Sequence, residues 1–342
     1  MTYLVGKIAL DIVAGAPNNG LGEDNVAKVK QIRIGRNDHP YVSAQAFRRW
    51  LRDSLPADED RSPVTRTGSG KKQQAYTAGR PDRFLDDDLF GYMVALKGEG
   101  TCQRDTVLAT GTFLSVAPRP AKKDWGTMSR GFGAGDNPVI HEHEFYSAEL
   151  AGDVLLDLPR VGVFEVDGSG LKVALTAKAA TEAKSQGAEE TVFRGVSSLR
   201  LSLDERRRRT AVLLRGLAAV RGGAKRALHY GDRTPALILL APMKGGVNPF
   251  TRIFAARDGR CLFAADVLRE EIDAWADELD GPVLLGWAPG FLGEQRDKAL
   301  ADLDDLVADG TLRIDHPRRM LNDLASAIER GEHDSWFEDA TV

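Results

Sequence analysis

Apolar residues recur along this chain with two different periods, and the order of these periods limits the folds available to it. The opening segment alternates, which predicts a half-buried strand whose apolar face is formed by Leu4, Ile8, Leu10 and Ile12. A helical period follows, then a long polar excursion, a second strand, a helix over residues 204–220 and a buried strand over residues 233–242. This order is typical of an α+β fold in which a ferredoxin-like sheet with two packed helices carries large insertions.

The first predicted helix combines an apolar stripe with a basic face. Ser43 is expected to cap its N-terminus. The stripe is formed by Ala44, Phe47, Leu51 and Leu55. The other faces carry Gln45, Arg48, Arg49 and Arg52. Because Arg48 and Arg52 lie off the stripe, we expect the core to tolerate their joint replacement by Glu, whereas Arg49 can pair with Asp53 one turn on.

Charge is segregated along the chain, although its net value is only −4. Residues 265–310 hold 13 acidic and 3 basic side chains, and the residues that follow are acidic as well. Residues 1–264 therefore carry a net positive charge. This asymmetry suits a polyanionic partner, although an acidic helical tail that only increases solubility would produce it too.

The cysteines and the N-terminus indicate the compartment. Cys102 and Cys261 form neither a disulfide framework nor a metal-type cluster in the sequence, which favours a reducing environment. Lys7 and Asp11 interrupt the apolar N-terminal stretch, so we expect neither a signal peptide nor a membrane span there. The expectation is a cytoplasmic protein with no membrane partner.

Two basic, glycine-containing segments interrupt the predicted core, at residues 61–80 and 118–136. The first is expected to be a mobile loop, with cations at Lys71, Lys72 and Arg80. The second interleaves cations with apolar groups at Lys122, Lys123, Trp125, Met128, Arg130 and Phe132. Cations along the phosphates with apolar groups against the bases are typical of single-stranded nucleic-acid binding. We favour that function for both segments over simple solvation.

Two other charged motifs are expected to be structural. Four successive arginines at residues 206–209 spread around a helix, since neighbouring residues point about 100° apart, so ion pairing or solvation is favoured over a nucleic-acid patch. The HEHE motif at residues 141–144 lacks further ligands, which favours a polar strand face over a metal site. The sequence contains no phosphate-loop, dinucleotide or nucleophile-elbow motif, so catalysis is poorly supported.

Four blocks resemble, in order, the DevR-type backbone subunits of type I CRISPR effector (Cascade) complexes, members of the RAMP superfamily. The blocks are NNGLGEDNVAKVKQIRIGRNDHPYVSAQAFRRWLR, DLFGYM, HEHEFYSAELAGDVLLDLPRVGVFE and LILLAPMKGGVNPF. The resemblance covers most of residues 1–260 and implies an RRM-like (ferredoxin-like) palm with finger and thumb insertions. It also implies non-catalytic subunits that polymerise head to tail along a guide RNA and present it to target DNA, together with other effector subunits.

By this resemblance the first palm helix faces the guide RNA. The implied RNA-binding residues are Asn18, Asn19, Lys28, Lys30, Ser43, Gln45, Arg48, Arg52, Lys122, Lys123, Trp125, Met128, Lys225 and Lys244. The implied organisation is a first palm part (1–57), a finger insertion (58–112), a thumb-like projection (113–140), a second palm part (141–264) and an acidic, helical C-terminal extension (265–342).

Two other functions stay open at this point. Related RAMP proteins are endoribonucleases, and the RDT motif (104–106) or the HEH motif (141–143) could supply catalytic side chains. A DNA-binding regulator is the third function, but no helix-turn-helix pattern supports it. We expect the chain to be no enzyme and to hold no cofactor and no metal.

Overall fold

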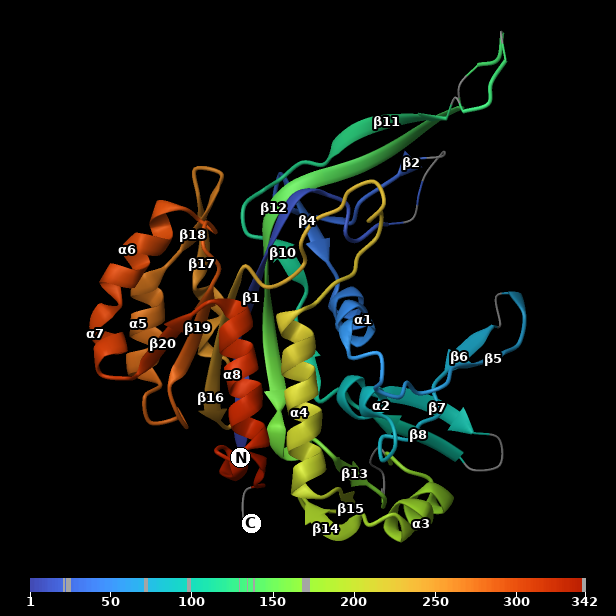
Figure 1. The fold of residues 1–342 in the computed structure, drawn as a ribbon, viewed down its shortest axis with the longest axis vertical. Helices are drawn as coiled ribbons and strands as arrows, with labels where there is room; N and C mark the ends of the chain where they lie inside the picture. The colour runs from blue at the N-terminus through green and yellow to red at the C-terminus, as the bar shows by residue number, and fades with distance from the viewer. Residues whose placement is uncertain are drawn as a thin grey trace.

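A computed structural model describes residues 1–20, 22, 26–70, 73–96, 100–128, 130–133, 135–137, 139–167 and 173–339 of the chain. These residues form a mixed α/β structure around a large central sheet (Figure 1). Insertions leave the sheet on one side, and a long hairpin extends beyond one end of it (Figure 1).

The sheet is built around three long strands: β1 (Thr2–Gly15), β12 (Val139–Asp157) and β16 (Leu237–Lys244). β1 pairs antiparallel with both neighbours, so that Gly6 lies opposite Val154 on β12 and opposite Leu240 on β16. Beyond β16 the sheet continues with β19 (Val283–Trp287) and β20 (Leu312–Asp315). Beyond β12 lie β9 (Leu108–Thr110), β10 (Phe113–Ser115), β4 (Asn37–Val42) and β3 (Gln31–Ile34).

β1 is buried on both faces, whereas the alternation in the sequence predicted one buried face. The predicted face is correct, since Leu4, Ile8, Leu10 and Ile12 are all at most 1% exposed and belong to one core cluster. Val5 and Ala9 point to the opposite face and belong to a second core. The prediction of a half-buried strand was therefore wrong, because the C-terminal part of the chain covers the second face.

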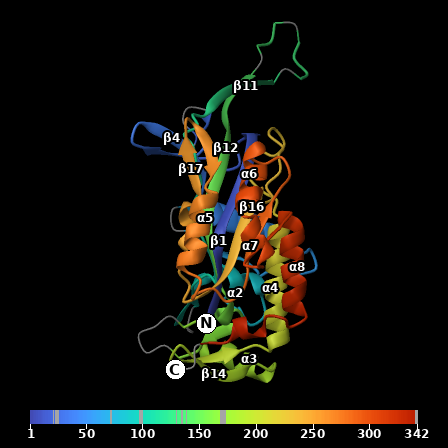
Figure 2. The ribbon, with the colours of Figure 1, turned by 90° about the vertical axis from the view of Figure 1, so that its left-hand side faces the viewer.

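Two helices cover the first face of the sheet: α1 (Ala44–Ser54) and α4 (Leu203–Ala218). Ser43 caps α1 as predicted, with its Oγ accepting a hydrogen bond from the Ala46 amide at 3.4 Å. In the predicted stripe Phe47, Leu51 and Leu55 are buried and Ala44 is partly buried, and Trp50 joins it by packing edge-on against Phe47. α8 (Pro317–Glu329) packs beside α4 (Figure 2). Within the described ranges, no helix is both long enough and apolar enough to cross a membrane.

The C-terminal part is more than the helical extension that the sequence predicted. α5 (Ala265–Ala274) and α6 (Glu294–Asp302) pack on the second face of the sheet, while α7 (Asp304–Ala308) follows α6. β19 is buried over its whole length. β20 was not predicted, and it extends the sheet by pairing parallel with β19. The acidic tail is thus an integral part of the central sheet.

Three insertions leave this core. Residues 61–80 contain the short hairpin β5 (Thr65–Thr67) and β6 (Gln74–Tyr76), where the sequence predicted a loop. α2 (Leu85–Phe90) and the hairpin β7 (Tyr92–Leu96) and β8 (Gly100–Arg104) follow. A small unit with its own core contains β13 (Val163–Glu165), α3 (Ala177–Ser185), β14 (Glu189–Phe193) and β15 (Val196–Arg200). β11 (Lys122–Met128) pairs with the first half of β12 to form the projecting hairpin.

Candidate nucleic-acid interface

The basic face of α1 starts with a hydrogen-bonded arginine. Gln45 is exposed, and Arg48 lies partly buried with its Nη1 donating to Thr110 Oγ1 at 3.1 Å. Burial and the neighbouring Arg52 guanidinium lower the pKa of Arg48. No described carboxylate lies within ion-pairing distance of Arg48, so its charge is available to an anion approaching this face.

Arg52 is held differently from Arg48, although both were predicted to contact RNA. Its Nε lies 3.7 Å from Asp86 Oδ2, and its guanidinium lies over the Phe90 ring at 5.0 Å. Arg52 therefore joins α1 to α2, so we expect its replacement to affect stability, contrary to the expectation from the sequence. The predicted Arg49–Asp53 pair is confirmed, with Nε 2.7 Å from Oδ2 on the exposed side of the helix.

Backbone hydrogen bonds fix the position of the loop before α1. This loop contains the short strand β2 (Val26–Ala27) and leads into β3, with Lys30 between the two strands. The Lys30 amide donates to the Asn18 carbonyl at 3.0 Å, and the Tyr41 amide donates to the Lys30 carbonyl at 3.0 Å. This ladder places Lys28 and Lys30 beside the start of α1.

The two predicted asparagines in this loop are more buried than a surface contact requires. Asn18 is 8% exposed and its Nδ2 donates to the Tyr41 carbonyl at 3.2 Å, which is a structural role. Asn19 is partly buried, and its Oδ1 has no hydrogen-bond partner among the described residues. The Asn19 Oδ1 atom is therefore an unused hydrogen-bond acceptor in this loop.

Lys225 reaches the same region from a segment far away in sequence. The Ala224 amide donates to the Pro17 carbonyl at 2.9 Å, and the Arg221 amide donates to Ser54 Oγ at 2.8 Å. The segment after α4 therefore runs along α1 toward the hairpin (Figure 1). Two exposed cations there, Arg221 and Arg226, were missed from the sequence, although their position beside the Gly222–Gly223 pair was a usable signal.

The projecting hairpin exposes its predicted side chains. Lys122 and Lys123 are exposed, and Lys123 pairs with Glu142 across the strands at 2.6 Å. Trp125 is 65% exposed and Met128 is 49% exposed, so neither belongs to a core. β2 pairs parallel with β12 at the hairpin base, and the Val29 amide donates to Glu144 Oε2 at 3.0 Å. The hairpin is thereby joined to the loop that carries Lys28 and Lys30.

Other predicted cations lie apart from this surface. Lys244 pairs with Thr2 in the register of β1 and β16, at the opposite end of β1 from Gly15, which at about 3.3 Å per residue is roughly 40 Å away. Its Nζ donates to the Asp277 carbonyl at 3.1 Å. Arg80 is also held in ion pairs, since its guanidinium binds Asp82 and Glu182, each at 2.7 Å. Lys71 and Lys72 lie outside the described residues.

The arginine run on α4 is structural, which confirms the favoured interpretation. Arg206 donates to the carbonyls of Val161, Pro159 and Phe337. Arg207 pairs with Asp334, Arg208 pairs with Glu59, and Arg209 pairs with Asp88 at 2.8 Å. Asp88 is fully buried and also binds Arg104, so one carboxylate ties α2 to α4 and β8.

The two histidines of the HEHE motif share one face of β12 but differ in exposure. His141 is exposed, while His143 is 7% exposed with its Nε2 3.6 Å from Asp124 Oδ2. The His143 and His229 rings lie 5.0 Å apart, and His229 stacks on Phe145 at 5.3 Å. Among the described residues, no three His, Cys, Asp or Glu side chains gather as a metal site requires. The motif instead packs the base of the hairpin against the segment after α4.

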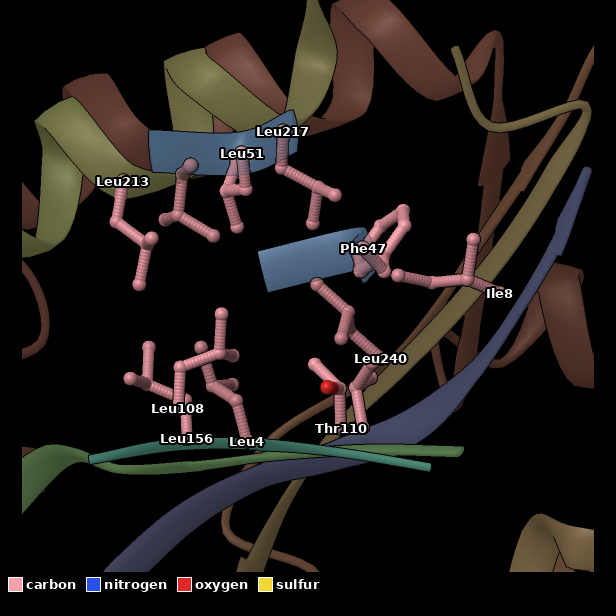
Figure 3. Close-up of a pocket in the computed structure, with 12 residues that line it drawn as sticks. Leu4, Ile8, Phe47, Leu51, Leu108, Thr110, Leu156, Leu213, Leu217 and Leu240 are labelled. Carbon is pink, nitrogen blue, oxygen red and sulfur yellow. The ribbon is translucent and has the colours of Figure 1, made fainter. Parts of the chain in front are cut away.

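A small apolar cavity of about 20 Å³ lies between the two helices and the sheet (Figure 3). Phe47 and Leu51 from α1, Leu213 and Leu217 from α4 and several strand leucines line it. Its polar lining is the Thr110 hydroxyl, which is already hydrogen-bonded to Arg48. Such a space is a packing defect of the core and offers no group for chemistry.

Comparison with known proteins gives a likeness of fold. No protein-family model matches the chain, and no curated protein matches it. A chain described as "CRISPR RNA-guided surveillance complex, pre-nicking" superposes with a TM-score of 0.62 at 11% identity, over 95% of this chain and 100% of that chain. The two chains share one fold. A second chain, described as "CRISPR RNA-guided surveillance complex", gives a TM-score of 0.54 at 14% identity over 96% of this chain and 99% of that one.

Proposed function

We propose that this protein is a guide-RNA-binding backbone subunit of a type I CRISPR surveillance complex. In this role it holds the guide RNA for pairing with target DNA and contacts other copies of itself head to tail, as well as other effector subunits. One observation carries the proposal: the loop before α1, which carries Lys28 and Lys30, and the segment after α4, which carries Lys225, meet at the base of a projecting hairpin. The α1 cations Arg48 and Arg52 lie on the side of that helix that contacts Thr110 and Asp86. The fold on which they meet is shared with chains of solved surveillance complexes.

The strand order supports an RRM-like palm within this fold. β16, β1, β12 and β9 are neighbours in that order, and α1 and α4 pack on one face. In sequence the elements run β1, α1, β9, β12, α4, β16, which is the order of a ferredoxin-like unit. The residues between α1 and β9 correspond to the finger insertion, and the hairpin of β11 and β12 corresponds to the thumb.

The RNA cannot use the sheet face on which an ordinary RRM stacks bases. That face of β1 packs against Leu268 and Ile272 of α5. The cations of α1 and the hairpin remain as the surface for a polyanion. Such a surface suits a guide carrier, because contacts to phosphates position the strand without reading its sequence and leave the base edges free to pair.

Head-to-tail contact between identical subunits follows from the same role. A heterologous interface that does not close generates an open helical filament, and the length of the guide RNA would limit its growth. The exposed hairpin supplies an arm that can reach a neighbouring copy. Trp125 and Met128 on this arm are the side chains that we assign to base displacement along the RNA.

Filter binding of the purified protein to unrelated single-stranded RNAs of about 30 nucleotides tests the proposal. Binding releases counterions from the RNA phosphates, and added salt opposes this release. RNA affinity should therefore fall at least tenfold between about 50 mM and 200 mM salt, with little difference between RNA sequences. Affinity that does not change with salt would contradict the proposal. The same reactions, run on a denaturing gel with and without Mg²⁺, test the absence of catalysis: intact RNA is expected, and cleavage would favour the endoribonuclease alternative.

A further inference from the structure

The segment after α4, residues 221–233, forms a strap across the base of the hairpin. It is bound to α1 through Ser54, to the loop after β1 through Pro17, and to β12 through the stacking of His229 on Phe145. Gly222 and Gly223 near its start have φ of +158° and +93°, values that favour glycine. The strap therefore begins at two glycines whose backbone conformation favours glycine and ends at a buried arginine, Arg233.

Arg233 is buried without the partners that a buried guanidinium needs. Its side chain belongs to a residue that is 3% exposed, and its Nη1 donates to the Asp232 carbonyl at 2.7 Å. Its Nε and Nη2 are buried and have no hydrogen-bond partner among the described residues. The hydroxyl of Tyr146, 1% exposed on β12, is buried and unpartnered in the same way. Burying such groups is unfavourable unless an acceptor meets them.

The nearest charges compensate Arg233 only in part. The Asp232 carboxylate accepts hydrogen bonds from the Arg233 and Thr234 amides and from Thr234 Oγ1, and no hydrogen bond joins it to the guanidinium. Burial lowers the pKa of Arg233 and Arg226 lowers it further, whereas the nearby Tyr146 and Asp232 raise it. An arginine keeps its proton at neutral pH. The strap therefore holds a buried cation whose hydrogen-bond donors are only partly used.

The chain leaves space for this guanidinium. A Cβ at Gly231 would lie 2.9 Å from Nη1 of Arg233, and a Cβ at Gly15 would lie 3.3 Å from its Nη2. Two glycines from different parts of the sequence thus allow the guanidinium to lie against bare backbone. The backbone around Arg233 therefore accommodates its guanidinium specifically.

We propose that Arg233 and Tyr146 form a phosphate-binding site that the strap opens to the bound RNA. A guanidinium presents parallel N–H donors that match two oxygens of a phosphate, and the tyrosine hydroxyl adds a third donor. Lys225 and Arg226 on the same strap supply further positive charge. The statement that the bound phosphate belongs to an RNA strand rests on the proposed function, whereas the anion site itself does not.

Substitution of a phosphate-binding arginine and of a structural arginine should have different effects on stability and on RNA affinity. Removing an unpartnered buried charge should leave the RNA-free protein as stable as before or more stable, while RNA affinity falls. Arg233→Met keeps an unbranched apolar stem and removes the guanidinium with its charge. Arg206→Met is the matched control, because Arg206 is also buried, at 4% exposure, but donates to three carbonyls.

Fluorescence anisotropy with a labelled single-stranded RNA of about 30 nucleotides and thermal unfolding of the RNA-free protein test the site. Arg233→Met should weaken RNA binding about tenfold without lowering the melting temperature. Tyr146→Phe should weaken binding less, again without loss of stability. Arg206→Met should lower the melting temperature and leave the affinity unchanged. Unchanged RNA affinity in Arg233→Met would overturn the proposal.

Inorganic phosphate separates this proposal from the proposed function. In sodium phosphate, compared with sodium chloride at the same ionic strength, both proteins gain the general stabilisation that phosphate gives, and the melting temperature of the wild type should rise more than that of Arg233→Met. If the wild-type protein binds no RNA, the proposed function fails, but this phosphate response would still support the anion site. If wild type and Arg233→Met respond equally to phosphate, the anion site is overturned whatever RNA does.

Discussion

The Nε of Arg52 on α1 lies 3.7 Å from Oδ2 of Asp86 on α2, across 34 residues of sequence that include the first insertion. Asp86 is 4% exposed, and its other oxygen accepts a hydrogen bond from the Ser62 amide at 3.1 Å. The basic face of α1 is therefore not uniform. Arg52 anchors the insertion to α1, whereas Arg48, one turn earlier, has no carboxylate partner among the described residues.

Arg52→Glu should destabilise the protein. The substitution removes the cation over Phe90 and places a carboxylate beside the buried Asp86, which should lower the free energy of unfolding by about 1–3 kcal/mol. Urea unfolding followed by circular dichroism measures this. Arg49→Glu is the control, because its side chain is exposed and should change stability by no more than about 0.5 kcal/mol. Equal stability of the two variants would show that the Asp86 contact contributes nothing.

Arg48→Glu should affect RNA binding more than folding. Its loss removes one hydrogen bond to Thr110, worth about 1 kcal/mol of stability, and reverses the charge that faces the proposed RNA. We expect RNA affinity at low salt to fall at least tenfold and the salt slope to decrease by about 0.7 for each lost phosphate contact. A filter-binding salt series measures both quantities. RNA affinity equal to that of Arg49→Glu would mean that this side of α1 does not face RNA.

Asp88→Asn should cause the largest stability loss of the substitutions considered. The Asp88 carboxylate is fully buried between Arg104 and Arg209, so its neutralisation removes the counter-ion that the two buried guanidinium groups share. Of the described carboxylates, Arg209 then keeps only Glu205, and Arg104 keeps only Glu165 at 3.8 Å. The expected loss in the free energy of unfolding is about 3–5 kcal/mol, measured by urea denaturation. Asp204→Asn is the control, since Asp204 pairs with Arg207 but is 89% exposed in its side chain. A small effect for Asp88→Asn would show that water reaches the triad.

Stability should fall as the pH is lowered from about 7 to about 5.5. Burial lowers the pKa of His229, and the neighbouring His143 lowers it further. In the unfolded chain His229 binds a proton near pH 6.5, whereas in the folded protein it stays neutral to lower pH. The contribution of His229 to the free energy of unfolding is therefore fully present above about pH 6.5 and decreases below it. Burial lowers the pKa of His333 in the same direction.

The pH dependence of the free energy of unfolding, measured by urea titration at several pH values, checks this assignment. His229→Gln should flatten the profile in that window, whereas His141→Gln, at an exposed position, should leave its shape unchanged. If His229→Gln and wild type have parallel profiles, His229 does not titrate abnormally in the folded protein.

Local patterns in the sequence predicted the elements that later positioned the interface. The stripe of α1, its Ser43 cap and the apolar face of β1 depend only on residues within a few positions of one another, and these predictions are confirmed. The spreading of residues 206–209 around α4 also follows from helical geometry, so their structural role was predictable.

What the sequence did not reveal depends on partners far apart in the chain. Arg52 meets Asp86, and Arg209 meets Asp88 across 121 residues, so no local pattern distinguishes a free arginine from a paired one. The second buried face of β1 is covered by α5, more than 250 residues later. β20 was missed because four residues, LRID, give too short an alternation to separate a strand from its helical surroundings.

The central claim is that the surface around α1 carries a guide RNA, and sequencing of the RNA that copurifies with the protein tests it most directly. The protein would be purified at low salt from a host that carries its CRISPR array, and the bound RNA extracted and sequenced. We predict RNAs of uniform length that begin or end in array repeat sequence, and their loss from the Arg48→Glu variant. Recovery of no RNA, or of random cellular fragments in both proteins, would contradict the account.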